Sequence, residues 1–471
     1  MPKPFLYALF GLWLGQAAAA PIIHGEAFYP NPESALESQF TGQAPEAFWA
    51  ALARAKELME AGKLDEAEAA YQDLRRKTSG ELKFEPTFQL AQIRLRQGRF
   101  RQAISLFLEI LNRRPDLPRV RLDLALAYFL DKNYEDAARQ FELVKGGELP
   151  PEVLAKVEGF LEAIRRQKNW TVDFTLGLAP DSNINQASGG KEECLDLAGD
   201  FKGLTLCRPL PQKASGVGAN LNATVNYFWR LSQDWGLKAT VGGYGLAYEQ
   251  NDNEFNDYSL YAALGPRYLW ESGEASLQPT FRKRWLANRE YSREHGLRYD
   301  LTQNLGRLIV EAGLGYGETR YDEAYIDDFL RGSSKSFRLW PRYILNDRTF
   351  VQTGLDFLRE KAKERACAND NRRYSLGLYR VLPHGISLYA EGSLMETDYK
   401  AAQWYITRDN RLTEGVREDK TWRLLTSLSS NAFESLGLTP VLQYTYTKRK
   451  SNIWSREYDQ HRVSLLFNYR I

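Results

Sequence analysis

Histidines and carboxylates are the side chains of this chain best suited to metal binding or acid–base catalysis. The four histidines stand far apart, and no two have the spacing of a metal site: they are His24, His295, His384 and His461. Aspartates and glutamates are scattered, and no glycine-rich loop for phosphate binding is evident. We therefore expect no catalytic residue, no metal and no cofactor, which favours a binding or transport protein over an enzyme.

The N-terminus has the pattern of a secretory signal. Lys3 gives a small positive region, residues 5–15 are mainly apolar, and the alanines at 17–19 supply the small side chains that a signal peptidase requires. The apolar run is short for a membrane-spanning helix. We predict a signal peptide over 1–20 and a lead segment over 21–46 before the first folded domain.

The predicted export also bears on the three cysteines. Cys194 and Cys207 lie in one predicted loop, and exported proteins meet an oxidising compartment. We expect these two to form a disulfide bond, with two free thiols as the alternative. Cys367 lies in another loop and has no partner in this scheme.

A helical repeat is predicted for residues 47–168. The segments that begin at Gly62, Gly98 and Lys132 resemble one another, and their spacing of 36 and then 34 residues is close to the tetratricopeptide period of about 34. Each segment carries a small residue and, four positions later, an aromatic one. These anchors are Ala67, Ala103 and Ala137, and Tyr71, Phe107 and Phe141.

The repeat has a physical reason and a functional implication. One helix pair cannot bury its apolar stripe alone, so the alanines let helices approach closely while the aromatic ring fills the groove to the next pair. Repeats of this kind bind peptide segments along a concave face. Gln92, Arg96 and Arg119 are the residues that we expect to face it, although solvated helix surfaces explain each of them equally well.

The remainder of the chain, 169–471, alternates between apolar and polar residues. In the last segment Val463, Leu465 and Phe467 are apolar while Ser464 and Asn468 face the other way, which is typical of a transmembrane β-strand. Fourteen such runs are predicted: 170–178, 215–230, 235–249, 256–269, 275–288, 296–304, 307–320, 334–345, 349–360, 373–382, 386–397, 421–432, 438–449 and 459–471.

The predicted connections alternate in length. Those after even-numbered strands are short, whereas those after odd-numbered strands are mostly longer and polar, such as 179–214, 321–333 and 401–420. Outer-membrane barrels have short periplasmic turns and long external loops. The alternation of short and long connections therefore predicts a periplasmic repeat domain below an outer-membrane barrel. A soluble β-sandwich is the less suitable alternative.

Composition agrees with a barrel. Mean hydropathy is −0.49, yet 13% of residues are aromatic, with 26 Tyr, 23 Phe and 11 Trp. A polar lumen combined with lipid-facing aromatic residues at the two interfaces reconciles these values. The net charge of +2 favours no nucleic-acid partner.

The two-part architecture resembles the surface lipoprotein assembly modulator (Slam) family, which joins a signal peptide, a short tetratricopeptide domain and a fourteen-stranded barrel. The stretch 174–187, which contains Asp181, Ser182 and Asn183, resembles that family's entry to the barrel. A structural turn is the simpler explanation of these three residues, because their side chains bond to nearby backbone amides. The chain departs from common barrels in ending on Ile471 rather than on an aromatic residue.

The resemblance implies a translocator or assembly factor that delivers client proteins, either surface lipoproteins or soluble secreted proteins, from the periplasm to the cell surface. Further partners that we expect are a periplasmic chaperone, outer-membrane lipid and the barrel assembly machinery. The client would pass through the lumen or along the seam between the first and last strands. A polysaccharide exporter, a porin-like channel with protein-binding repeats, and an adhesin acting through external loops are the alternatives.

Overall fold

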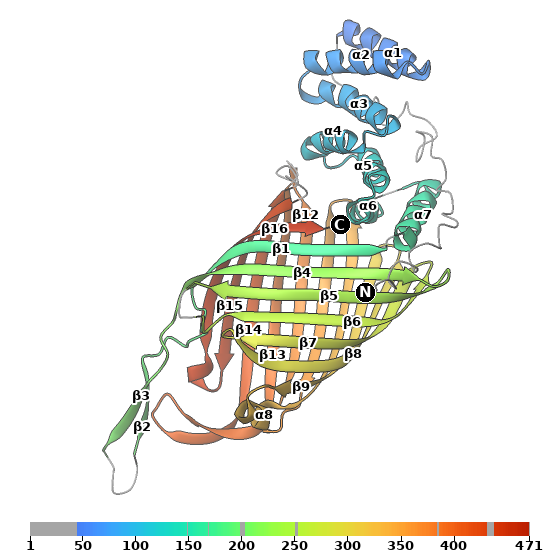
Figure 1. Cartoon of the computed structure of the whole chain (residues 1–471). Coiled ribbons are helices and arrows are strands. Elements are labelled where there is room, and N and C mark those ends of the chain that lie inside the picture. Colours follow the sequence, from blue (N-terminus) through green and yellow to red (C-terminus); the bar gives the residue numbers. More distant parts are fainter. Residues whose placement is uncertain are drawn as a thin grey trace, which may run out of the picture. The chain divides into compact units, whose positions relative to one another are not determined.

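The computed structural model describes residues 45–147, 149–167, 169–197, 203–249, 253–383, 386–430 and 438–470. The predicted signal peptide, nearly all of the lead segment, His24 and His384 lie outside these ranges. Helices come first in the chain and strands follow (Figure 1). The chain forms two compact units, which divide between Arg99 and Phe100. In the described part of the chain, none of the helices has the length and apolar character to cross a membrane.

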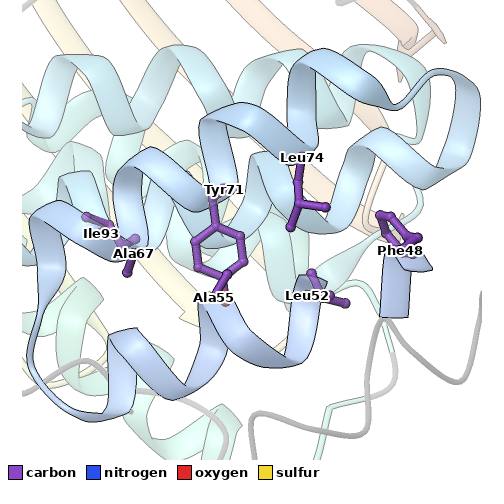
Figure 2. Packing of buried hydrophobic residues seen from close by; sticks show 7 residues of the cluster. All are labelled: Phe48, Leu52, Ala55, Ala67, Tyr71, Leu74 and Ile93. Carbon is purple, nitrogen blue, oxygen red and sulfur yellow. The ribbon is translucent and has the colours of Figure 1, made fainter. Parts of the chain in front are cut away.

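The first unit is helical. It contains α1 (Glu46–Glu60), α2 (Leu64–Lys77), the 3-10 turn η2 (Gly80–Lys83) and α3 (Phe84–Arg96). Its core, shown in Figure 2, consists of seven buried side chains, namely Phe48, Leu52, Ala55, Ala67, Tyr71, Leu74 and Ile93. Ala67 is fully buried and Tyr71 is 1% exposed, so the small and the aromatic anchor of the first repeat lie together in this core.

The repeats share one turn geometry. Gly62, Gly98 and Lys132 follow the first helix of successive repeats, and their φ angles are +75°, +72° and +62°. At each turn two amide groups donate back into the preceding helix, for example from Lys63 to the carbonyl of Leu58 at 3.0 Å. This is the Schellman arrangement, in which a left-handed residue ends the helix. Glycine adopts that conformation without strain, so the turn explains the recurring Gly at the first two positions.

The second unit begins with four helices, α4 (Phe100–Arg113), α5 (Pro118–Leu130), α6 (Tyr134–Val144) and α7 (Pro151–Gln167). Pro118 stands at the start of α5, where its missing amide hydrogen costs no helical bond. Ala103, Phe107, Ala137 and Phe141 are all fully buried. The Phe141 ring stacks on Phe160 of α7 with centroids 5.3 Å apart, which joins the third repeat to the last helix.

A closed antiparallel barrel of fourteen strands follows, as the sequence predicts. Its strands are β1 (Trp170–Asp181), β4 (Gly216–Arg230), β5 (Trp235–Tyr248), β6 (Asp257–Trp270), β7 (Gly273–Leu286), β8 (Arg289–Leu305), β9 (Leu308–Tyr321), β10 (Gly332–Asn346), β11 (Thr349–Glu360), β12 (Asn369–Val381), β13 (Ile386–Ile406), β14 (Leu412–Ser430), β15 (Leu438–Ser451) and β16 (Tyr458–Arg470). Neighbours in sequence pair with each other, and β16 returns to β1.

The outer face of the barrel is apolar, and an aromatic band borders it on the helix side. Exposed leucines and valines such as Leu178, Leu264 and Leu465 project outward. Near the ends of β1, β4, β5 and β6 on the helix side lies a band of exposed aromatic rings, which includes Trp170, Tyr227, Trp229, Trp235 and Tyr268. An apolar belt with aromatic rings at its border is typical of a barrel embedded in an outer membrane.

The structure corrects the expected loops in three places. The segment 401–420, predicted to be a loop, continues β13 to Ile406 and resumes as β14 at Leu412, because long strands can project beyond the membrane and stay paired without an apolar face. The loop 182–215 contains a two-stranded hairpin, β2 (Glu192–Asp196) and β3 (Thr205–Pro209). The loop 322–331 contains a short helix, α8 (Ala324–Leu330). The hairpin of β2 and β3 and the helix α8 lie at the end of the barrel away from α6 and α7 (Figure 1).

Candidate functional site

The seam between the first and last strands is the shortest ladder of the barrel. Asp173–Leu178 of β1 pair with Arg470–Leu465 of β16, and the register then skips to the single pair Asp181↔Arg462. On its other side, β1 pairs with β4 without a break from Trp170 to Asp181. Pro180 lies in the skipped stretch and has no amide hydrogen to offer. At the end of the seam away from the helices, the main-chain ladder is therefore interrupted, and side chains must hold the two strands together.

A buried carboxylate closes this end of the seam. The side chain of Asp181 is fully buried and accepts hydrogen bonds from Arg462 Nε and Nη2 at 2.9 and 2.7 Å. It also accepts bonds from Gln460 Nε2 at 3.0 and 2.8 Å. Hydrogen bonds to an ionised carboxylate are about twice as strong as neutral ones. We call Asp181, Gln460 and Arg462, together with Ser182 and Asn183, the seam clasp.

The next two residues complete the clasp. The Asn183 amide donates to Asp181 Oδ1 at 2.9 Å, which is the side-chain turn that the sequence predicts. Ser182 and His461 exchange two bonds, one from the Ser182 amide to the His461 carbonyl at 3.0 Å and one from the His461 amide to Ser182 Oγ at 2.9 Å. Sequence reasoning predicted the local turn but not this bridge to β16, because the partners lie 279 positions away.

At the opposite end of the barrel, helix α7 is fastened to short barrel turns. Arg166 Nη1 donates to the main-chain carbonyl of Gln233 at 2.9 Å and lies 3.7 Å from the Asp234 carboxylate. Arg165 Nη2 donates to the carbonyl of Glu271. Arg307, from the turn between β8 and β9, donates to the carbonyl of Gly147 at 3.1 Å. The last helix and the segment before it are therefore held on three successive turns.

Charged groups meet where α5 faces the turn between β10 and β11. Arg121 is 3% exposed, and its guanidinium donates to Gln140 Oε1 at 2.9 Å and to the Pro115 carbonyl at 2.7 Å. Burial raises the pKa of Asp347 above the usual range of an aspartate, and the nearby Arg121 and Arg348 offset this only in part. Burial likewise raises the pKa of Glu142 on α6. The attachment of helices to barrel thus encloses ionisable groups away from water.

A cavity of about 360 Å³ lies between these helices and the lumen, and we call it the mouth cavity. Its helical wall includes Leu111, Leu124, Arg121 and Gln140. Its barrel wall is formed by inward-facing residues of β1, β4 and β12–β16, which include Thr175, Asn222, Ser387, Ser429, Thr439 and Asn468. The cavity reaches β1 and β16 at the continuously paired end of their seam, so it is the place in the second unit where repeats, lumen and seam meet.

The predicted client-binding residues are found in both units. Gln92 is buried in α3, and Arg96 is exposed at the end of the same helix. Arg119 is half-buried in the first turn of α5. Their contact with a client stays a prediction. Sequence reasoning missed Arg121 and Arg166, because neither their burial nor their bonds leave a trace in local sequence.

The predicted disulfide bond is present. Cys194 of β2 and Cys207 of β3 are bonded and face each other as a register pair, so the bridge staples the hairpin. In the part of the chain that the structure describes, the only group with the spacing of metal ligands is Glu192 with these two cysteines. Their sulfur atoms are bonded to one another and are not available as thiolate ligands.

Known proteins resemble both parts of the chain. The family described as "Surface lipoprotein assembly modifier" matches residues 170–470, and its "N-terminal TPR repeats" match residues 83–141. A protein of Pasteurella multocida named surface lipoprotein assembly modifier is 25% identical over 405 residues, which cover 80% of this chain and 75% of the relative.

Two further relatives span similar shares. Surface lipoprotein assembly modifier 1 of Neisseria meningitidis is 26% identical over 375 residues, 79% of this chain and 72% of its own. Hemophilin secretion modulator of Acinetobacter baumannii is 22% identical over 394 residues, 79% of this chain and 76% of its own. Since the barrel match alone covers more than half of the sequence, the chain belongs to the surface lipoprotein assembly modifier family.

Proposed function

We propose that this protein delivers particular client proteins from the periplasm to the cell surface or to the exterior, across an outer membrane that its barrel spans. The observation that carries the proposal is that one family matches both the repeats and the barrel. The names of the relatives speak of surface lipoprotein assembly and of hemophilin secretion. The client of this protein is accordingly either a lipid-anchored or a soluble protein.

The orientation that we propose places the helices in the periplasm. Helix α7 is fastened to the short turns between β4 and β5 and between β6 and β7. Outer-membrane barrels direct their short turns to the periplasm. The stapled hairpin and α8 then lie on the outer side, where a disulfide bond persists. A signal peptide over 1–20, a lead segment over 21–46, repeats over 47–168 and a barrel over 169–471 complete the proposed domain plan.

The repeats would hold the client below the membrane, and the barrel would pass it on. Gln92, Arg96 and Arg119 are the proposed contacts on the repeats. A periplasmic chaperone, membrane lipid and the barrel assembly machinery are proposed as further partners. Folding of the client outside the cell would bias the direction of transfer without a nucleotide. This scheme assigns no covalent chemistry to the chain.

The experiment that tests the proposal is deletion of the gene, followed by comparison of the surface-exposed and secreted proteomes with those of the wild type. We expect a few proteins to disappear from the outside and to accumulate in the periplasm. Complementation with the full chain restores them. A barrel lacking residues 47–168 should not restore them, and its membrane insertion is checked by the shift in electrophoretic mobility on heating.

Other outcomes would contradict the proposal. An unchanged exterior proteome with loss of a surface polysaccharide would indicate an exporter of polysaccharide. An unchanged proteome with altered uptake of small solutes would indicate a porin-like channel. Full export by the barrel without its helices would remove the role proposed for the repeats.

A further inference from the structure

A second group of exposed aromatic rings lies on the outer face of the barrel, near its end away from the helices. The rings stand on β9–β12 and β14, and they are Tyr316, Phe337, Phe357, Tyr374 and Trp422. Phe337 and Phe357 are register partners, and their ring centroids lie 6.1 Å apart. Aromatic rings on the outside of a barrel lie at the level of the lipid headgroups. The outward-facing residues just beyond them therefore meet those headgroups.

Cations stand just beyond three of these rings. Side chains two positions apart on a strand share one face. On β10, β11 and β12, the residue two positions beyond the ring, toward the end of the barrel away from the helices, is Lys335, Arg359 and Arg372 respectively. Three neighbouring strands thus present a cation at the same height on the outer face.

Two of these cations face each other directly. Lys335 and Arg359 are register partners across β10 and β11. Like charges directly opposite each other destabilise a sheet. In the part of the chain that the structure describes, no carboxylate forms an ion pair with Lys335. An anion bound between the two cations would remove the repulsion, so this arrangement favours a negatively charged ligand.

The two arginines are held in position by carboxylates. Arg359 donates from Nε and Nη2 to the two oxygens of Asp370 at 2.8 and 3.1 Å, and Lys400 Nζ lies 2.7 Å from the same carboxylate. Arg372 donates from Nη2 to Asp398. A guanidinium carries five N–H donors, so each arginine keeps further donors after these bonds. Donors that are fixed in this way suit the planar, bidentate binding of a phosphate group.

These side chains line one groove on the outer surface, which we call the headgroup groove. It is lined by the cations Lys335, Arg359 and Arg372, by the carboxylates of Asp370 and Asp398, and by the rings of Phe337 and Phe357. Ser336, Leu358 and Asn371, which alternate with these residues along the strands, complete the lining. Positive charges outnumber negative ones in the groove, and the aromatic rings form its border toward the apolar belt.

Resting on the orientation given under the proposed function, in which this end of the barrel is external, we infer that the headgroup groove binds the phosphorylated headgroup of lipid A. This glycolipid forms the external leaflet of an outer membrane. One phosphate would lie between Lys335, Arg359 and Arg372, and the acyl chains would descend past Phe337 and Phe357. Hydrogen bonds from cations to phosphate are about twice as strong as neutral ones. The bound lipid would hold β10–β12 at a fixed depth in the membrane.

The test titrates the purified full chain, washed free of bound lipid in detergent, with lipid A. Native mass spectrometry measures the fraction of barrels that carry one lipid. Lipid A stripped of its phosphate groups by a phosphatase and phosphatidylglycerol, a phospholipid, serve as comparison ligands. The variants are Lys335→Gln, which breaks no described ion pair, Arg372→Gln, and the two combined. Arg380→Gln is the matched control, because Arg380 faces outward on β12 like Arg372 but stands at the opposite end of the strand.

We expect lipid A to bind the wild type at least about fivefold more tightly than either comparison lipid does, because charge-assisted bonds to its phosphate are added. The double variant should lose at least about fivefold in affinity, and Arg380→Gln should stay within about twofold. All variants must show the heat-dependent mobility shift of a folded barrel. Equal affinity of the wild type and the double variant would overturn the assignment of the groove.

The comparison lipids decide the chemistry of the ligand. Equal binding of dephosphorylated lipid A would overturn the role of the phosphate. Equal binding of phosphatidylglycerol would indicate a surface for anionic lipids in general and would overturn the choice of lipid A.

A separate measurement checks the orientation. Asp409→Cys in a Cys367→Ser background places a thiol at the exposed tip of the hairpin of β13 and β14. A membrane-impermeant maleimide should label it in intact cells, and absence of labelling would overturn the external placement of the groove. Loss of clients on gene deletion, together with lipid binding that ignores the double variant, would remove this inference and leave the proposed function standing. Binding in the groove with an unchanged exterior proteome would do the reverse.

Discussion

The carboxylate of Asp181, near the end of the first barrel strand, is enclosed by the guanidinium of Arg462 on the last strand, with two hydrogen bonds of 2.9 and 2.7 Å to one oxygen. The pair joins the two termini of the barrel sheet at the point where their ladder is interrupted. Its removal should therefore affect the closure of the barrel more than the loss of an ordinary surface ion pair would.

Replacing Asp181 with alanine should destabilise the barrel by about 3–5 kcal/mol, because Arg462 is left as an uncompensated charge in a partly buried position. The measurement is the urea concentration at which the purified barrel loses its heat-dependent mobility shift. Asp409→Ala, at an exposed hairpin tip, is the matched control and should change stability by less than about 0.5 kcal/mol. Equal midpoints for both variants would show that the clasp does not hold the seam.

A disulfide bond across the seam should block export. Leu178 and Leu465 are register partners on β1 and β16, so cysteines at both positions can be joined. Opening the barrel here separates fewer register pairs than at any other pair of neighbouring barrel strands, so we expect the client to use this seam. Leu176 and Leu221, partners on β1 and β4, form the matched control pair. The variants are built in a Cys367→Ser background to avoid mispairing.

Export by the oxidised Leu178–Leu465 pair should fall at least fivefold and return on reduction, whereas the oxidised control pair should export normally. The readout is the amount of each client outside the cell before and after addition of reductant. Normal export through a fully oxidised seam would place the route in the lumen alone.

The aromatic anchors of the repeats should carry much of the helical stability. Phe141 is fully buried and stacks on Phe160. Phe141→Ala leaves a cavity in the core and should cost about 3–5 kcal/mol. Thermal unfolding followed by the helical circular dichroism signal measures the loss. Phe329→Ala on α8, where the ring is 40% exposed, is the control and should leave the melting curve unchanged. Similar losses in both variants would contradict the assigned role of the anchor.

The attachment of α5 to the barrel should become more stable on acidification. Burial raises the pKa of Asp347 in the turn after β10, against the lowering effect of Arg121 and Arg348 and with a further small rise from Asp116. A folded-state pKa above the unfolded value of about 3.9 means that the folded protein holds the proton more tightly. The ionised form therefore costs stability at neutral pH, and the cost disappears as the pH falls through the raised pKa.

Asp347→Asn removes this cost, so it should raise the melting temperature of the helices at pH 7 and flatten its dependence between pH 7 and pH 4. Asp116 affects stability in the opposite direction. A hydrogen bond from Arg114 lowers the pKa of this carboxyl group, so its contribution to stability is present at neutral pH and is lost only on stronger acidification. Melting curves at several pH values for the wild type and the variant provide the test. A lower melting temperature for Asp347→Asn at pH 7 would show that the pairing with Arg121 outweighs burial.

Periodic features were predictable from the sequence, and long-range ones were not. The recurrence of Ala67, Ala103 and Ala137 identifies helical repeats, because every helix pair needs a small residue where its helices approach closely. Alternation of Val463, Leu465 and Phe467 identifies a strand because lipid lies on one side only. Where a strand leaves the lipid that constraint ends, so the paired ends of β13 and β14 were mistaken for a loop.

The candidate site shows the same limit. The turn at Asp181 could be predicted, since an aspartate side chain bonds to an amide two residues later. Its bonds to Gln460 and Arg462 depend on barrel closure, which brings together residues from the two ends of the sheet. The position of Arg121 over the lumen likewise depends on where the helices rest, and no local pattern specifies it.

The arginines that fasten the helices to the barrel donate hydrogen bonds to main-chain oxygens. These are the carbonyl oxygens of Gln233, Glu271 and Gly147. A carbonyl oxygen is present whatever side chain occupies the position. The sequences of the turns that hold Gln233 and Glu271 are therefore free to drift without loosening the joint, provided that the turn lengths are kept, whereas the turn between β8 and β9 must keep Arg307. Such joints let the surfaces of the helices and of the lumen diversify independently in evolution while helices and barrel remain coupled.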